Sequence, residues 1–155
     1  MRKFCLFVGL FLLMSQSVMG QKIEAQIFKD QFGKAGALTT TTEYLFFSAS
    51  MQASKVLKAA FEELKIDQKV LDRQNILYVS DIRAMPKAIS QMIAIPKMKK
   101  YPFSVYFLED DEKTANWPQK EDTLTILVLD NLEVRKVEYF KESDVLVEYL
   151  KEIIN

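Results

Sequence analysis

The sequence contains no histidine, and its single cysteine, Cys5, stands near the amino terminus. Histidine is the usual general base at neutral pH and a common metal ligand, while cysteine thiolates carry out disulfide exchange and bind zinc and copper. One cysteine cannot form an intramolecular disulfide. Three kinds of site are therefore missing: a histidine-dependent active site, a disulfide framework, and a zinc or copper centre built from these two residue types.

Glycine and proline are also scarce, with four residues of each among 155. The sequence has no Gly-rich phosphate loop and no dinucleotide-binding fingerprint, so no nucleotide or flavin cofactor is expected. No internal repeat, low-complexity tract or Gly/Ser linker divides the chain. The length suits one domain, and a content of 49% hydrophobic and 27% charged residues is typical of a globular protein.

Residues 1–20 have the pattern of a secretory signal peptide. Two basic residues precede an apolar run over residues 4–14, and a polar bridge and a small-residue site follow it. The run is about half the length that a helix needs to cross a bilayer. We expect cleavage after Gly20, a mature domain over residues 21–155, and a periplasmic location. The alternative is an uncleaved anchor.

Removal of this leader takes away Cys5 and two of the 21 basic residues. The mature chain then has no thiol and carries 19 basic against 21 acidic residues, a net charge of about −2. Nucleic acid is not an expected partner, because binding to phosphates needs a basic surplus. The same count gives no general attraction to anionic lipid, although a local basic patch is compatible with it. No integral membrane span remains after cleavage.

Hydrophobic periodicity in the mature chain predicts alternating strands and helices. Predicted strands lie at 43–47, 75–82 and 103–110, and predicted helices at 54–66, at 86–96 and from Ser143 to the end. Residues 123–140 have the pattern of a β-hairpin with its turn at Asp130–Asn131. Strand–helix units followed by antiparallel pairing indicate an α/β fold: a mixed sheet with flanking helices and a C-terminal hairpin plus helix.

The second predicted helix has clear signals at both ends. Pro86 suits a first helical turn, and Pro96 is expected to end the helix because proline has no amide hydrogen to donate. Between them, Ile89, Met92 and Ile93 recur at helical spacing. This spacing predicts that the three side chains form a buried face.

Two segments resemble the thioredoxin-like redoxin superfamily. "DQFGK", residues 30–34, resembles the entry turn of its secreted members. "YLFFSASMQASKVL", residues 44–57, resembles the strand, active turn and helix that carry Cys-x-x-Cys followed by lysine. On that pattern Met51 and Ser54 stand at the two cysteine positions and Lys55 at the lysine. The resemblance implies a thioredoxin-like three-layer α/β sandwich that lacks the redox dithiol.

The same family places a cis-proline beside its dithiol, just before a core strand. Pro102, in "KYPFSVYF", is the candidate for this position, with Tyr101 before it. A cis bond before proline is a specific conformational commitment. The hairpin at 123–140 also resembles the terminal hairpin of the family, and in that alignment no proline precedes the strand correctly.

Disulfide exchange requires a thiolate and a second sulfur to resolve the mixed disulfide, and neither methionine nor serine replaces them. The family resemblance then implies non-covalent binding of a peptide or an envelope protein, since the redoxin groove also recognises extended backbone. We expect an apolar contact from Met51 and backbone hydrogen bonds beside Pro102. The candidate binding residues are Ser48, Ser50, Met51, Gln52, Ser54, Lys55, Tyr101 and Pro102.

Two other functions remain open on the sequence. A small hydrolase or transferase would use a serine of this turn as nucleophile and a buried Lys55 as its base. Against this, Ser50 or Ser54 is expected to cap the following helix, with Lys55 in solvent. The third possibility is a structural subunit of an envelope complex.

Metal ions find few ligands in this sequence. Met51, Met85, Met92 and Met98 offer only thioethers, and we expect Met85 and Met92 to pack in the core because of their helical spacing. The acidic run at 109–112 lacks the spacing of a calcium loop and is expected to be a solvated turn.

Four aromatic residues have two interpretations. They form a pocket or partner surface, or they divide between the core and the exposed faces, with the only tryptophan holding its polar loop against the domain. These residues are Tyr101, Phe103, Tyr106 and Trp117.

Overall fold

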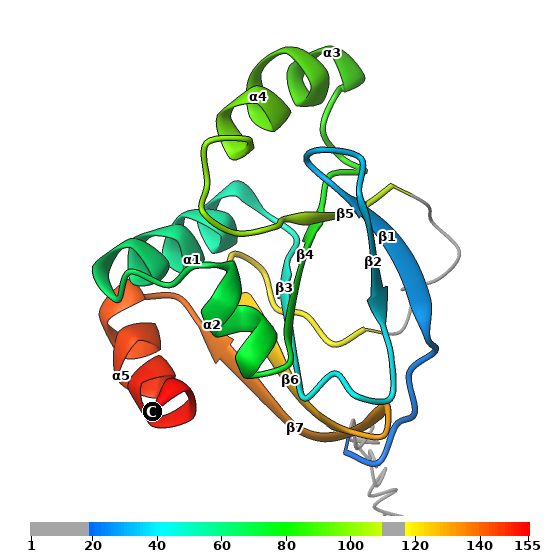
Figure 1. Cartoon of the computed structure of the whole chain (residues 1–155), viewed down its shortest axis with the longest axis vertical. Helices are drawn as coiled ribbons and strands as arrows, with labels where there is room; N and C mark the ends of the chain where they lie inside the picture. The colour runs from blue at the N-terminus through cyan, green and yellow to red at the C-terminus, as the bar shows by residue number, and fades with distance from the viewer. Residues whose placement is uncertain (1–18, 110–116) are drawn as a thin grey trace, which may run out of the picture.

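The computed structural model describes residues 19–109 and 117–155 (Figure 1). The predicted leader lies outside them except for its last two residues, and so does most of the acidic run at 109–112. No helix of the described ranges has the length and apolar character to cross a membrane. The elements in chain order are β1 (Gln26–Asp30), β2 (Ala35–Leu38), β3 (Tyr44–Ser48), α1 (Met51–Glu63), α2 (Gln68–Arg73), β4 (Ile76–Asp81), α3 (Lys87–Ile89), the π-helix η1 (Ser90–Ala94), α4 (Ile95–Met98), β5 (Tyr106–Leu108), β6 (Leu124–Asp130), β7 (Glu133–Phe140) and α5 (Ser143–Ile154).

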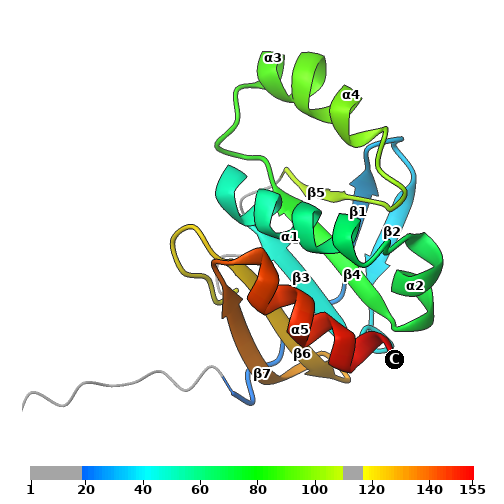
Figure 2. The same ribbon diagram turned by 90° about the vertical axis from the view of Figure 1, so that its left-hand side faces the viewer.

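Seven strands form one mixed sheet in the order β2-β1-β5-β4-β3-β6-β7. Its centre is parallel, since β3 pairs with β4 and β4 pairs with β5. The hairpin β6–β7 joins antiparallel to β3, and β1 joins antiparallel to β5. Helices α1, α2 and α5 lie on one face of the sheet, which Figure 2 shows toward the viewer. The predicted mixed α/β sheet with a C-terminal hairpin and helix is confirmed.

Both faces of the sheet carry an apolar core. Strands β3 and β4 are buried along almost their whole length, as central parallel strands are. The core on the helical side includes Phe46, Phe61 and Leu146, and the core on the opposite side includes Leu45 and Leu127. These two cores fix the carboxyl ends of the central strands in place.

The aromatic residues pack in these cores. Trp117 is buried on the side opposite the helices, with its ring centroid 5.1 Å from that of Phe47 and 6.2 Å from that of Phe28 in edge contacts. Phe103 is buried against Phe61, with 5.0 Å between the ring centroids. Trp117 therefore packs onto the sheet, in agreement with the second of the two interpretations of these aromatic residues.

Helix α1 begins at Met51, three residues before its predicted start. Ser50 is the reason, because its Oγ accepts the backbone N–H of Ala53 at 3.1 Å and so caps the first turn. From Ala53 to Phe61 the apolar residues recur every three to four positions and turn toward the sheet. The predicted amphipathic helix is confirmed, and its cap connects it directly to the end of β3.

The predicted helix between Pro86 and Pro96 differs from the structure at its end. Pro96 does not end it, because the π-helical turn Ser90–Ala94 precedes this proline and α4 continues beyond it. In a regular α-helix the proline ring would meet the carbonyl group of residue 92, and a wider turn avoids that contact. We refer to residues 87–98, which form α3, η1 and α4, as the end helix.

The predicted burial of Ile89, Met92 and Ile93 is wrong. These side chains are 44%, 77% and 59% exposed. The end helix lies across one end of the molecule, beyond the layer that α1 and α5 form on the sheet (Figures 1 and 2). Helical spacing of apolar residues is present, but no neighbouring layer covers this face. The expected packing of Met92 in the core is wrong for the same reason.

Four smaller differences concern element boundaries and one short helix. Strand β5 covers only three residues of the predicted strand 103–110, and the sequence pattern gives no sign of α2, whose six residues are too few to show a period. The hairpin turn lies at Asn131 and Leu132, one residue later than predicted, with φ values of 52° and 65°. Glu142 precedes α5 as its N-cap, so that Ser143 is the first helical residue rather than the cap.

Candidate functional site

Six of the eight candidate residues lie in the β3–α1 turn, residues 48–55. Strand β3 ends at Ser48, whose side chain is fully buried, and helix α1 begins at Met51, directly after its N-cap Ser50. Met51 and Gln52 follow as exposed residues of the first helical turn. The turn therefore stands at the carboxyl end of a central parallel strand, where α/β folds place their binding sites.

Hydroxyl groups behind the turn form one connected network. Ser48 Oγ lies 2.9 Å from Tyr78 Oη and donates a hydrogen bond to Ser80 Oγ at 3.3 Å. Ser54 Oγ donates to Ser48 Oγ at 3.0 Å, so the network joins β3, β4 and α1. Buried hydroxyl groups that satisfy one another make a rigid site. The geometry therefore gives these serines a structural role behind the turn.

Tyr78 and Ser80 are members of the site that the sequence pattern did not single out. The feature that could have identified them is their position in β4, the strand next to β3, because the carboxyl ends of parallel strands meet at one edge of the sheet. Burial raises the pKa of Tyr78, and its hydrogen bonds to Ser48 and Ser54 act in the opposite direction. The phenol is therefore neutral at physiological pH and serves as a hydrogen-bonding group.

Serine catalysis with Lys55 has no support in this arrangement. Ser50 Oγ caps the helix, and Ser54 is hydrogen-bonded to Ser48 and to the carbonyl of Ser50 at 3.2 Å. Lys55 is exposed. It directly follows Ser54, and consecutive helical side chains point to different faces. Of the two serines predicted as the cap, Ser50 has that role, and the predicted solvent position of Lys55 is confirmed.

A shallow hollow of about 350 Å³ adjoins the turn. Ala49 and Ser50 line one side of it, and residues 119–123, the segment before β6, line the other. Met51 follows Ser50 in the chain and is 69% exposed. Met51 does not line the hollow, but it adjoins Ser50 in sequence, so an exposed apolar side chain and a polar hollow lie next to each other at the turn, a combination suited to binding an extended chain.

Tyr101 and Pro102 lie at a different place. They line a groove of about 640 Å³ beside the carboxyl-terminal half of α1, where Lys58 Nζ stands 5.7 Å from the centroid of the Tyr101 ring. The carbonyl of Pro102 accepts the backbone N–H of Gln68 at 3.0 Å. No residue lines both this groove and the hollow at the turn. The structure therefore does not bring the two candidate segments together.

The proposed cis-proline at Pro102 is wrong. The Tyr101–Pro102 peptide bond is trans, and the described residues contain no cis peptide bond. Strand β6 lies antiparallel beside β3 with Leu124 opposite Ser48, so the residue that enters the strand next to the turn is Thr123. The alternative alignment, in which the terminal hairpin follows no proline, is the one that the strand order supports.

The described residues contain no cluster of candidate metal ligands. Among residues 19–109 and 117–155, no three carboxylate, histidine or cysteine side chains gather into a group that would hold a metal ion. Met51 and Met92 are exposed, and Met85 and Met98 are half-buried, on different elements.

No protein-family model and no curated protein sequence matches this chain. Solved structures match most of it. The peroxidoxin BcpB from Mycobacterium tuberculosis superposes with a TM-score of 0.53 at 11% identity, over 88% of this chain and 93% of that one. A thio-disulfide isomerase from Thermus thermophilus gives a TM-score of 0.51 at 17% identity, over 87% and 96%. A SCO1/SenC family lipoprotein from Bacillus anthracis gives 0.51 at 13%, over 88% and 96%.

The domain has a thioredoxin-like fold. The identities of these structures are low, so the likeness concerns the fold alone. In this thioredoxin-like domain, Met51 and Ser54 are the first and fourth residues of α1, the positions at which the predicted alignment sets the two cysteines. The part of the chain that the structure describes has no cysteine at all.

Proposed function

We propose that this thioredoxin-like domain binds an extended segment of a peptide or protein non-covalently at the β3–α1 turn. The observation that carries the proposal is the exposure of Met51 in the first turn of α1, next to the hollow between residues 49–50 and 119–123. A methionine side chain is flexible and polarizable, and it adapts to irregular apolar partners. Most of the Met51 side chain is exposed and takes no part in the packing of the domain.

The rigidity of the turn supports this binding role. The network of Ser48, Ser54 and Tyr78 fixes the turn from behind, and the cap of Ser50 fixes the first turn of α1. A preorganised surface binds with a smaller loss of conformational entropy. The sequence predicts main-chain hydrogen bonds to the bound peptide beside Pro102. We assign these hydrogen bonds instead to residues 119–123, because these residues face the turn across the hollow.

The compartment belongs to the same proposal. The signal-peptide pattern of residues 1–20 sends the domain to the bacterial envelope, where its partner is an envelope protein or peptide. Mass spectrometry of the exported protein tests this part. A product beginning at Gln21 supports export and cleavage, and a full-length product that remains in the cytoplasm contradicts it.

Nuclear magnetic resonance titration with cysteine-free peptides tests the binding site. A panel of extended peptides, varied in hydrophobicity, is added to the ¹⁵N-labelled domain. We expect chemical-shift changes at residues 49–52 and 119–123, and their loss in Met51→Asp. Met92→Asp is the matched control, because Met92 is also an exposed helical methionine and lies outside the turn.

Two outcomes would contradict the proposal. One is equal peptide binding by the wild type and Met51→Asp. The other is a set of shift changes confined to the groove beside Tyr101 and Pro102, which would place binding on the far part of α1. The folding of each variant is checked from the dispersion of its spectrum.

A further inference from the structure

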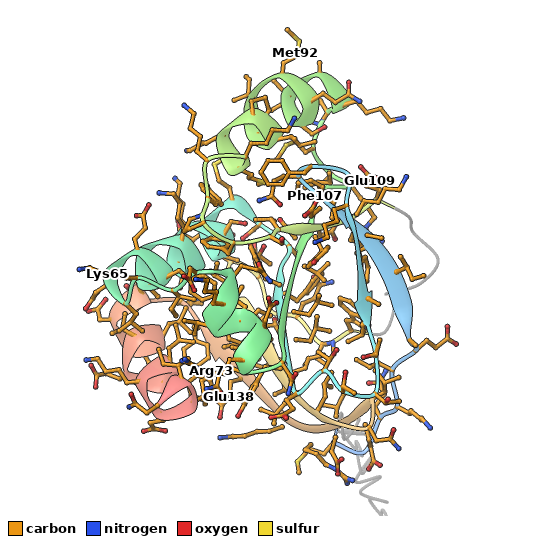
Figure 3. All side chains as sticks on the ribbon, viewed as in Figure 1. Lys65, Arg73, Met92, Phe107, Glu109 and Glu138 are labelled. Atoms are coloured by element: carbon orange, nitrogen blue, oxygen red, sulfur yellow. The ribbon has the colours of Figure 1, made fainter. Side chains whose placement is uncertain are left out.

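The end helix presents an apolar face that no part of the described domain covers. Of its twelve residues only Ser90 is buried. Met92 is 77% exposed and points away from the body of the domain (Figure 3). Ile89, Met92 and Ile93 stand at positions i, i+3 and i+4, so they share one face of the helix.

The opposite side of the end helix is attached to the domain. Ile95 and Met98 pack against the core on the helical side of the sheet. Gln31 adds a polar anchor, because its buried side-chain amide donates to the carbonyl of Met98 at 3.3 Å and to that of Phe103 at 2.8 Å. These contacts fix which face points outward, so the exposure of the apolar face is built into the fold.

The segment of chain that carries this face is basic, and two of its lysines, Lys97 and Lys100, line the groove beside α1. Between residues 82 and 108 the sequence has five basic residues and no acidic residue, although the predicted mature chain as a whole is slightly acidic. Arg83 forms an ion pair with Asp81 at 2.7 Å. The other four, Lys87, Lys97, Lys99 and Lys100, are exposed, and none of them enters an ion pair with another described residue.

We propose that the end helix binds to the surface of an anionic phospholipid bilayer. An interfacial helix buries apolar side chains at the boundary of headgroups and acyl chains, while lysines beside it contact the phosphates. Ile89, Met92 and Ile93 supply the apolar part, and the four lysines supply the charge. The helix lies across one end of the molecule, a geometry that lets it rest flat on a membrane (Figures 1 and 2).

Charge distinguishes the bilayer from two other occupants. A second copy of this chain would bring two sets of four lysines together and would be repelled. A nucleic acid would pair with the lysines but would leave the isoleucine and methionine side chains without an apolar environment. The anionic bilayer satisfies both the charge and the apolar face. This inference does not depend on peptide binding at the turn.

Vesicle co-sedimentation with the exported domain tests the proposal. The probes are vesicles of phosphatidylglycerol and phosphatidylethanolamine in equal parts and vesicles of phosphatidylcholine alone. We expect binding to the anionic vesicles, weakened by raising NaCl because salt screens the lysines. Lys99→Glu with Lys100→Glu should lower the partition coefficient at least about fivefold for each lysine, and Met92→Asp should lower it roughly tenfold or more.

Matched variants elsewhere on the domain serve as controls. Met51→Asp repeats the methionine change at the β3–α1 turn, and Lys69→Glu with Lys141→Glu repeats the charge change at exposed lysines outside the end helix. Both controls should bind anionic vesicles like the wild type. All of the substituted side chains are exposed, and circular dichroism checks that every variant keeps its fold.

Three outcomes would overturn the proposal. The first is no binding to anionic vesicles, and the second is equal binding to anionic and phosphatidylcholine vesicles. The third is concentration-dependent dimerisation that Met92→Asp abolishes while vesicle binding is absent. That last result would identify a second copy of the chain as the occupant of the face.

Discussion

Ser48 Oγ and Tyr78 Oη lie 2.9 Å apart, on neighbouring parallel strands, with both side chains buried. This contact stands directly behind the turn at which the redoxin pattern sets its cysteines. Ser80 and Ser54 complete the group of hydroxyls. The position that is reactive in a dithiol protein is here backed by a neutral hydrogen-bond network, which supports the proposal that the turn binds without reacting.

A double-mutant cycle tests this network. Tyr78→Phe removes the phenol oxygen and leaves the ring in the core, so we expect a loss of about 1 kcal/mol in the free energy of unfolding, with a similar loss for Ser48→Ala. The double variant should lose less than the sum, by roughly 0.5 kcal/mol or more, because the two hydroxyls share one contact. Guanidinium unfolding followed by Trp117 fluorescence gives the values. Strict additivity would show that the pair is not coupled.

Introducing two thiols at positions 51 and 54 tests whether the turn has the geometry of a redoxin active site. In the mature chain, we expect Met51→Cys combined with Ser54→Cys to form an internal disulfide and to reduce insulin, because positions i and i+3 adjoin on a helix and the helix N-terminus favours a thiolate. The wild type and each single variant should be inactive. A double variant that forms only intermolecular disulfides would argue that the turn has lost this geometry.

Gly36 in β2 faces the ring of Tyr106 at close range. A Cβ atom there would overlap the ring, so we expect Gly36→Ala to lower the free energy of unfolding by roughly 1–3 kcal/mol. Tyr106→Ala should reduce the additional cost of Gly36→Ala, because it removes the atoms that clash. Ala35→Ser is the control, since Ala35 is exposed, and its effect should stay within about 0.5 kcal/mol. Thermal unfolding of the wild type, the three single variants and the double variant measures these effects.

Tyr149 makes stability depend on pH in the alkaline range. Burial raises the pKa of Tyr149 to about 12, and the nearby Tyr44, Glu138 and Glu152 act in the same direction. The folded pKa is above the unfolded value of about 10, so this stabilisation is complete below pH 10 and is lost as the pH rises through about 12.

Denaturation midpoints between pH 8 and 12 check this expectation. The wild type should lose stability above about pH 10, and Tyr149→Phe should lose less, while the ring keeps its packing against Phe140 at 5.1 Å between centroids. The slope that remains belongs to the other tyrosines and the lysines whose pKa is raised, Tyr78 and Lys58 among them. Identical slopes in the two proteins would contradict the assignment to Tyr149.

The sequence predicts elements best where local pattern and tertiary packing agree. Helix α1 shows its period, its cap at Ser50 and its buried face, and the C-terminal hairpin and helix show theirs. The end helix shows a period of the same kind in Ile89, Met92 and Ile93, but its apolar face is outside. A period in the sequence shows which residues share a face of a helix, but it does not show what packs against that face.

The candidate site divides in the same way. The six residues of the β3–α1 turn are contiguous in the chain, so one short segment predicts their neighbourhood. The partnership between that turn and residues 119–123 depends on β6 lying beside β3, which the sequence leaves undecided between two alignments. Pro102 was the wrong choice because the strand that follows it, β5, is two strands away from β3 in the sheet.

The amino-acid sequence alone determined that this protein has no histidine and that its single cysteine, Cys5, lies in the predicted leader, since composition needs no coordinates. It also predicted the central strands, the helix after β3 and the C-terminal hairpin and helix from their local periods, but not β1, β2 or α2. Only the tertiary structure decided that Tyr78 closes the network behind the turn and that the end helix turns its isoleucines and Met92 to solvent. Both depend on which strands become neighbours in the sheet, and that choice is made by contacts distant in the chain.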